Sequence, residues 1–182
     1  MAKTHNADIA DETSSDLALA LMAEFAQWFQ ALGAKGVLPR AFTGVTKSGD
    51  QAVIILTGLP LDDVQRRELL IWLCRNEEFV AYAYGTHVGI ANDSSAGITE
   101  GLDIYASSDR YDTSMTLRVE RRADGNMQLF EENRTVLPAK QGNGLFSGLQ
   151  RSSERSSSEN DKVFREIWGD LKSKAMWRQR YS

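Results

Sequence analysis

The sequence predicts an α+β fold: an antiparallel sheet of about five to six strands with helices packed on one face, plus a C-terminal helix after a flexible linker. Two observations predict it. Apolar residues recur at helical spacing near both ends of the chain and around residue 70. Between residues 79 and 136, apolar and polar residues alternate in runs separated by turns, which is typical of strands with one buried face.

These patterns divide the chain into four parts. Residues 1–12 are polar and predict a disordered tail, and residues 13–149 form the α+β domain. Residues 150–160 are rich in serine and mixed charge, which predicts a flexible linker. Residues 161–182 predict an amphipathic helix.

The domain is expected to begin with two helices that flank a hairpin. Thr13 and Asp16 have the spacing of a capping box, and an apolar stripe follows until Gly33 or Gly36 ends the helix. A hairpin over 41–56 turns at Ser48-Gly49-Asp50. A second helix starts at Asp62, buries Val64, Leu70, Ile71, Leu73 and Cys74, and exposes Arg66, Arg67, Glu68 and Arg75.

The strands follow from Phe79 onward. A long strand over 79–90 contains Gly85, which predicts a bend or bulge. Alternation over 102–107 and 115–120 predicts two more strands, and a turn at 123–125 joins the latter to a partner over 127–136. A three-residue loop there would set Val119 opposite Leu129.

Composition excludes several function classes. The chain has 182 residues, a net charge of −4, one cysteine and two histidines, so it has no internal disulfide and no cysteine or histidine set for zinc. The net charge argues against a general nucleic-acid binder. The chain shows no secretory signal and no membrane-spanning run, and arginine exceeds lysine, which together predict a bacterial, cytoplasmic protein that does not enter a membrane. No motif indicates a cofactor.

The stretch Phe79–Arg110 holds most of the side chains that are candidates for catalysis or metal binding. It carries His87, followed by acidic residues that include Asp93 and Asp103. One hypothesis is a small hydrolase-like enzyme that uses His87 as general acid or base with carboxylates of the 93–103 region. A divalent-ion site built from Asp93, Glu100, Asp103, Asp109 and Asp112 is disfavoured, because short acidic side chains also suit turns and caps.

Two further sets are candidates for binding. Tyrosine and arginine carry binding energy when they gather on a surface, and such residues lie on the strands: Tyr82, Tyr84, Asp103, Tyr105 and Arg118. Alternation places Tyr82 and Tyr84 on one sheet face and His87 on the other, unless Gly85 shifts the register. The C-terminal helix adds Trp168 and Trp177 among basic residues, so nucleic-acid contact through this helix is an alternative.

The favoured interpretation is a non-enzymatic adaptor or inhibitor-type protein that acts through protein–protein contacts. Three helical stripes rich in tryptophan and phenylalanine and a half-wet sheet support it. From the size of the chain and its lack of motifs, this interpretation extends to an accessory or chaperone protein of a mobile element or a secretion system. A homodimer is an alternative, since an exposed aromatic residue on a terminal helix would favour self-association.

Overall fold

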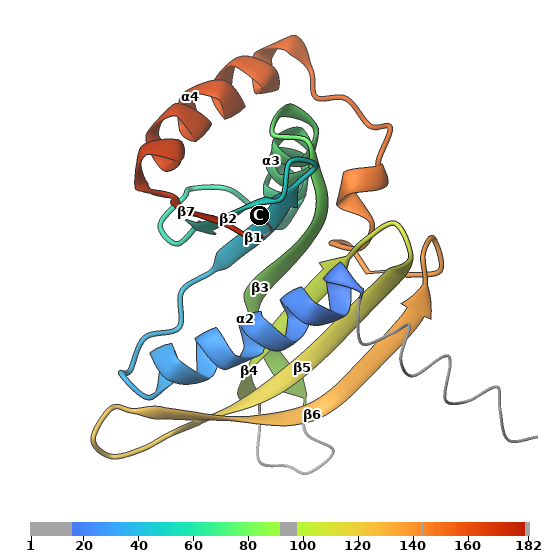
Figure 1. Cartoon of the computed structure of the whole chain (residues 1–182). Helices are drawn as coiled ribbons and strands as arrows, with labels where there is room; N and C mark the ends of the chain where they lie inside the picture. Colours follow the sequence, from blue (N-terminus) through green and yellow to red (C-terminus); the bar gives the residue numbers. More distant parts are fainter. Residues whose placement is uncertain (1–15, 92–97, 143, 181–182) are drawn as a thin grey trace, which may run out of the picture.

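Figure 1 shows the computed structural model of the chain, which describes residues 16–91, 98–142 and 144–180. The described elements follow in this order: α2 (Leu17–Gly33), β1 (Ala41–Thr46), β2 (Asp50–Ile55), α3 (Asp63–Asn76), β3 (Phe79–Ala91), β4 (Ile98–Ser107), β5 (Tyr111–Arg121), β6 (Met127–Pro138), the short 3₁₀ helix η1 (Leu149–Arg151), α4 (Ser158–Lys174) and β7 (Met176–Gln179). The strands form a seven-stranded antiparallel sheet in the order β6-β5-β4-β3-β1-β2-β7. The predicted α+β class with an antiparallel sheet is confirmed.

The sheet differs from the expectation in two details, since it has seven strands and helices cover parts of both faces. Helix α2 lies across β3 to β6 on one face, and α3 and α4 pack on the other (Figure 1). Strand β3 shows why. Ala81 and Ala83 contact the α2 core, whereas Tyr82 and Tyr84 belong to the core under α3 and α4. A central strand with apolar side chains on both faces of the sheet must be covered by other elements on both faces.

Helix α2 approaches β3 closely at one glycine. The side chain of Asp16 caps the helix by accepting from the amide of Ala18, and Thr13 lies outside the described residues. The apolar stripe buries Phe25 and Phe29. A Cβ at Gly85 would overlap the ring of Phe29. Pairing with β1 and β4 runs through Gly85 without a register shift, so there is no bulge at this position, and the glycine allows the close packing of Phe29.

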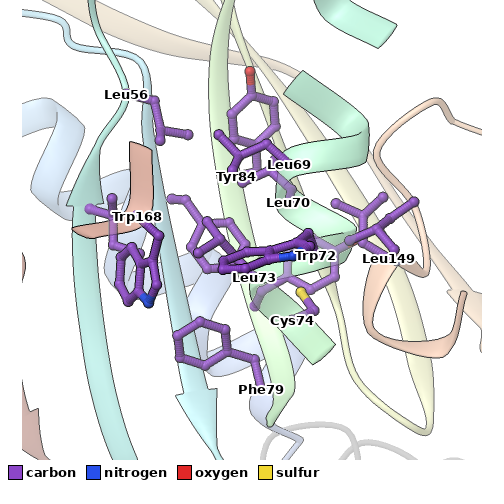
Figure 2. Close-up of a cluster of buried hydrophobic side chains, with 14 of the residues drawn as sticks. Leu56, Leu69, Leu70, Trp72, Leu73, Cys74, Phe79, Tyr84, Leu149 and Trp168 are labelled. Carbon is purple, nitrogen blue, oxygen red and sulfur yellow. The ribbon is translucent and has the colours of Figure 1, made fainter. Parts of the chain in front are cut away.

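Helix α3 is buried more deeply than its sequence pattern suggests. Six successive residues, 69–74, are buried, so the helix has no clean polar stripe (Figure 2). Val64, predicted to be buried, is 60% exposed, and Arg66, predicted to face solvent, is 4% exposed. The reason is local: the Arg66 guanidinium turns back to the carbonyl of Leu61 and to Asp63 at the start of the helix. These contacts replace the water lost by the two terminal nitrogens of the guanidinium, while its Nε is buried without a hydrogen-bond partner.

The β5–β6 hairpin keeps the expected register. Val119 pairs with Leu129, and both side chains face the α2 core. An irregularity between Thr116 and Leu117 shifts the pairing beyond that point. Most residues of β6 are exposed, and β6 forms one edge of the sheet.

The end of the chain is a helix followed by a strand rather than one long helix. Helix α4 is capped by Ser157 and docks on the domain through Phe164, Trp168 and Leu171. The predicted linker touches α3, where the two terminal guanidinium nitrogens of Arg67 donate to the carboxylate of Glu154. After Lys174 the chain becomes extended, and β7 pairs with β2. Backbone groups along the edge of β2 are satisfied by this pairing, which helical periodicity does not reveal.

A buried carboxylate fastens the glycine-rich segment 139–151 to the sheet. Asp112 on β5 is 2% exposed and accepts two hydrogen bonds from the Arg151 guanidinium, at 2.6 and 2.7 Å. It also accepts from the Ser107 hydroxyl at 2.5 Å and from the amides of Lys140 and Gly142. This carboxylate therefore joins three separate parts of the chain.

Acid should weaken this junction. Burial raises the pKa of Asp112, but the hydrogen bonds from Arg151 and Ser107 outweigh it, so the pKa lies below its usual value. A carboxyl with a lowered folded-state pKa contributes stability that is present above the unfolded pKa of about 4 and is lost as pH falls through the folded pKa. Between about pH 5 and about pH 2 the wild type should therefore lose more stability than Asp112→Asn, as measured by urea unfolding. Parallel pH profiles for the two proteins would contradict this assignment.

Candidate functional site

His87 is held by structural contacts near one end of the sheet. Its Nε2 lies 2.6 Å from the carbonyl oxygen of Leu38. Its Nδ1 lies 3.7 Å from Oε1 of Glu100. The two oxygens of that carboxylate each accept a hydrogen bond of 2.7 Å from Arg121, Oε2 from Nε and Oε1 from Nη2. Hydrogen bonding and charge from Arg121 lower the pKa of Glu100 despite partial burial, and His87 adds a smaller effect. His87 thus has a hydrogen-bond partner at its Nε2 and a carboxylate near its Nδ1.

The structure does not bring His87 together with Asp103. In the β3–β4 ladder His87 pairs with Leu102, while Asp103 pairs with Thr86, so the two side chains point to opposite faces. Asp103 accepts from the Thr116 hydroxyl at 2.6 Å and from the Tyr105 hydroxyl at 3.3 Å. Asp93 lies outside the described residues. The geometry on which the hydrolase hypothesis depends is therefore absent for His87 and Asp103.

Tyr82 and Tyr84 lie on one face as expected, but both are fully buried. The Tyr82 hydroxyl donates to the carbonyl of Phe146 and accepts from the amide of Leu149 at 3.2 Å. Burial raises the pKa of Tyr82 far above its usual value. The Tyr84 ring packs on Phe146 with 4.5 Å between centroids. These tyrosines hold segment 146–149 on the sheet, so neither presents a surface to a partner.

Tyr105 and Arg118 share the half-exposed sheet face with Asp103, as predicted. Burial and the neighbouring Asp103 carboxylate raise the pKa of Tyr105 to about 12. Arg118 pairs with Glu120 and Glu132 and lies 5.0 Å over the ring of Phe130. The positive charge of Arg118 is therefore neutralised by carboxylates on β5 and on the neighbouring strand β6. This face carries no uncompensated group among these residues.

The basic C-terminal helix is also compensated. Trp168 is buried, and its indole N–H donates to Glu77 at 2.6 Å. Three of the four cations along α4 form ion pairs with nearby carboxylates: Arg165 with Asp161, Lys172 with Glu77, and Lys174 with Asp170. These ion pairs neutralise part of the positive charge that nucleic acid would need, so the structure adds no support to that alternative.

A groove lies between α2 and the β1-β2-β7 end of the sheet, where the sheet face has no helix over it. Its volume is about 570 Å³. Apolar side chains from three elements line it, chiefly Trp28 of α2, Val53 of β2 and Met176 of β7. Met176 is 53% exposed and Trp177 is 39% exposed. Of the residues singled out from the sequence for binding, Trp177 is the one that borders this groove.

One end of the groove carries an arginine-rich network. Arg178 and Arg180 both bind the carboxylate of Glu24, at 2.8 and 2.5 Å. Both also donate to the side-chain oxygen of Gln51, which is itself buried. Burial raises the pKa of Glu24, but Arg180 and Arg178 outweigh it and the pKa is lowered. Two guanidinium groups therefore share the carboxylate of Glu24.

The two edges of the sheet differ in chemistry. Strand β6 exposes charged side chains at Glu131, Glu132 and Arg134, which discourage another strand from pairing there. Strand β7 exposes Met176 and Trp177 beside the groove. On its other face, a second hollow of about 460 Å³ lies beside Trp177. The two edges therefore expose different kinds of side chain, and the exposed apolar ones of β7 lie next to a groove.

Little in the sequence predicts this groove. It forms from segments near residues 25, 52 and 177, which meet only after β7 pairs with β2. Within the described residues, no group of histidine, cysteine and acidic side chains could hold a metal ion, and no helix has the length and apolar character to span a membrane. Comparison with known protein families, curated proteins and solved structures gives no match.

Proposed function

We propose that this chain is a non-enzymatic binding protein of the adaptor or inhibitor type, whose protein partner docks on the groove and the adjoining β7 edge. The observation that carries the proposal is the continuity of an apolar groove with an exposed strand edge. Single exposed apolar residues are ordinary on protein surfaces, but Met176 adjoins a concave apolar wall formed by Trp28 and Val53, and Trp177 follows it on the same exposed strand with its ring on the opposite face. A partner would remove this surface from water.

The setting we propose is the bacterial cytoplasm. The chain has a single cysteine, Cys74, which is buried, and burial raises the pKa of its thiol. A chain that relies on packing without disulfides suits a reducing compartment. A role as an accessory, inhibitor or chaperone of a larger bacterial system is compatible with this picture.

The test is comparative capture from lysate of the source organism. Met176→Glu places a charge at the mouth of the groove, so we expect at least a tenfold loss of the captured partner, quantified by mass spectrometry. Val136→Glu is the matched control, since Val136 is 41% exposed and lies on the opposite edge strand. Both variants should melt within a few degrees of the wild type. Equal recovery with Met176→Glu would show that the groove is not the binding surface.

A further inference from the structure

The backbone of β7 presents its outer hydrogen-bonding groups at alternate residues. The amide of Arg180 donates to the carbonyl of Gly49 at 3.0 Å, and Arg178 lies opposite Gln51 in the same ladder. In an antiparallel pair, alternate residues direct both backbone groups toward the same neighbour. The backbone groups of Arg178 and Arg180 therefore face β2, and those of Trp177 and Gln179 face the open side.

The side chains of β7 alternate between the two faces of the sheet. Met176 and Arg178 lie on the groove face, opposite Val53 and Gln51 of β2. Trp177 lies on the α4 face, where its ring is 6.5 Å from that of Phe79. An added strand would follow the same alternation, so every second side chain of that strand would lie beside the groove.

We propose that the partner supplies an extended segment that pairs with β7 as an eighth strand, with an apolar and an acidic side chain two positions apart on the groove face. This inference rests on the proposed function and specifies how that surface is used. The apolar side chain lies beside Met176 and the acidic one beside Arg178. Backbone hydrogen bonds to Trp177 and Gln179 give affinity, and the two side chains give specificity.

Charge favours a foreign acidic segment over a second copy of this chain. The Arg178 side chain is 61% exposed at the end of the groove, so a carboxylate on an added strand can approach its guanidinium and form a charge-assisted hydrogen bond. Antiparallel pairing of two β7 strands must keep corresponding faces on the same side. It would therefore bring the arginine networks of the two copies to the same face, where like charges repel.

The probe is a library of random eight-residue peptides displayed on phage and selected against the full chain. We expect the enriched peptides to place an aliphatic or aromatic residue and an aspartate or glutamate two positions apart. Selection against Arg178→Glu should replace the acidic residue with lysine or arginine at the same spacing. Peptides enriched without this spacing, or an unchanged preference with Arg178→Glu, would overturn the proposal.

A second variant tests the strand pairing itself. Gln179→Pro removes one outward N–H while the pairing of Arg178 and Arg180 with β2 is kept, and proline is tolerated at sheet edges. We expect at least a tenfold weaker affinity for a selected synthetic peptide, with the melting temperature kept within a few degrees. If Met176→Glu loses the lysate partner but Gln179→Pro binds normally, the groove function stands and strand addition is wrong. If the chain instead forms a dimer that Gln179→Pro dissociates, the occupant is a second copy and the proposal is overturned.

Discussion

Replacing Asp112 with alanine should lower the free energy of unfolding by about 3–5 kcal/mol. The carboxylate is 2% exposed, and the change leaves the Arg151 guanidinium partly buried without its counter-charge. The amides of Lys140 and Gly142 lose their acceptor as well. Because Asp112 joins the glycine-rich segment to the sheet, that segment should also loosen, with faster amide hydrogen exchange near Phe146 and Leu149.

Urea unfolding of the wild type and two alanine variants checks this expectation. Asp109→Ala is the matched control, since Asp109 is an exposed aspartate three positions away in the chain. Its cost should stay within about 0.5 kcal/mol. If Asp112→Ala were as mild as Asp109→Ala, the hydrogen bonds around Asp112 would contribute little net stability.

Local patterns were sufficient to predict most elements of the fold. Alternation over 115–120 and 127–136, with a short turn between, predicted the register that sets Val119 against Leu129, and the structure confirms it. The helical stripe of α2 is confirmed by the burial of Phe25 and Phe29. Such signals depend on neighbours within a few residues, which is why one sequence carries them.

Long-range pairing was beyond those patterns. Residues 176–179 follow a helical stripe, and their strand conformation depends on the open edge of β2, more than 120 positions earlier. Arg66 also shows the limit, because the contacts that bury it come from the turn before α3. Neither effect leaves a periodic trace.

The candidate site could likewise be predicted only in part, because exposure and grouping depend on segments that are distant in the sequence. Tyr82 and Tyr84 were predicted for binding because tyrosine often carries interface energy, but that rule presupposes exposure. Segment 146–149 folds back over them and removes them from the surface. The groove beside β7 combines residues from three distant segments. Of the residues predicted for binding, Trp177 alone borders it.

Phe29→Ala should destabilise the protein by about 3–5 kcal/mol, because Phe29 is fully buried against β3 and the aromatic rings of α2. Gly85→Ala should cost about 1–3 kcal/mol in the wild type, since its methyl group would overlap the Phe29 ring. In the Phe29→Ala background the same glycine change should cost almost nothing, because the space that the Phe29 ring occupied is empty.

Urea unfolding of the wild type, the two single variants and the double variant gives the coupling energy between the two positions. Gly169→Ala, where a Cβ meets no atom within 4 Å, is the control and should stabilise α4 by up to about 1 kcal/mol. Additive costs for Gly85→Ala and Phe29→Ala would mean that close packing on Phe29 is not the reason for a glycine in this strand.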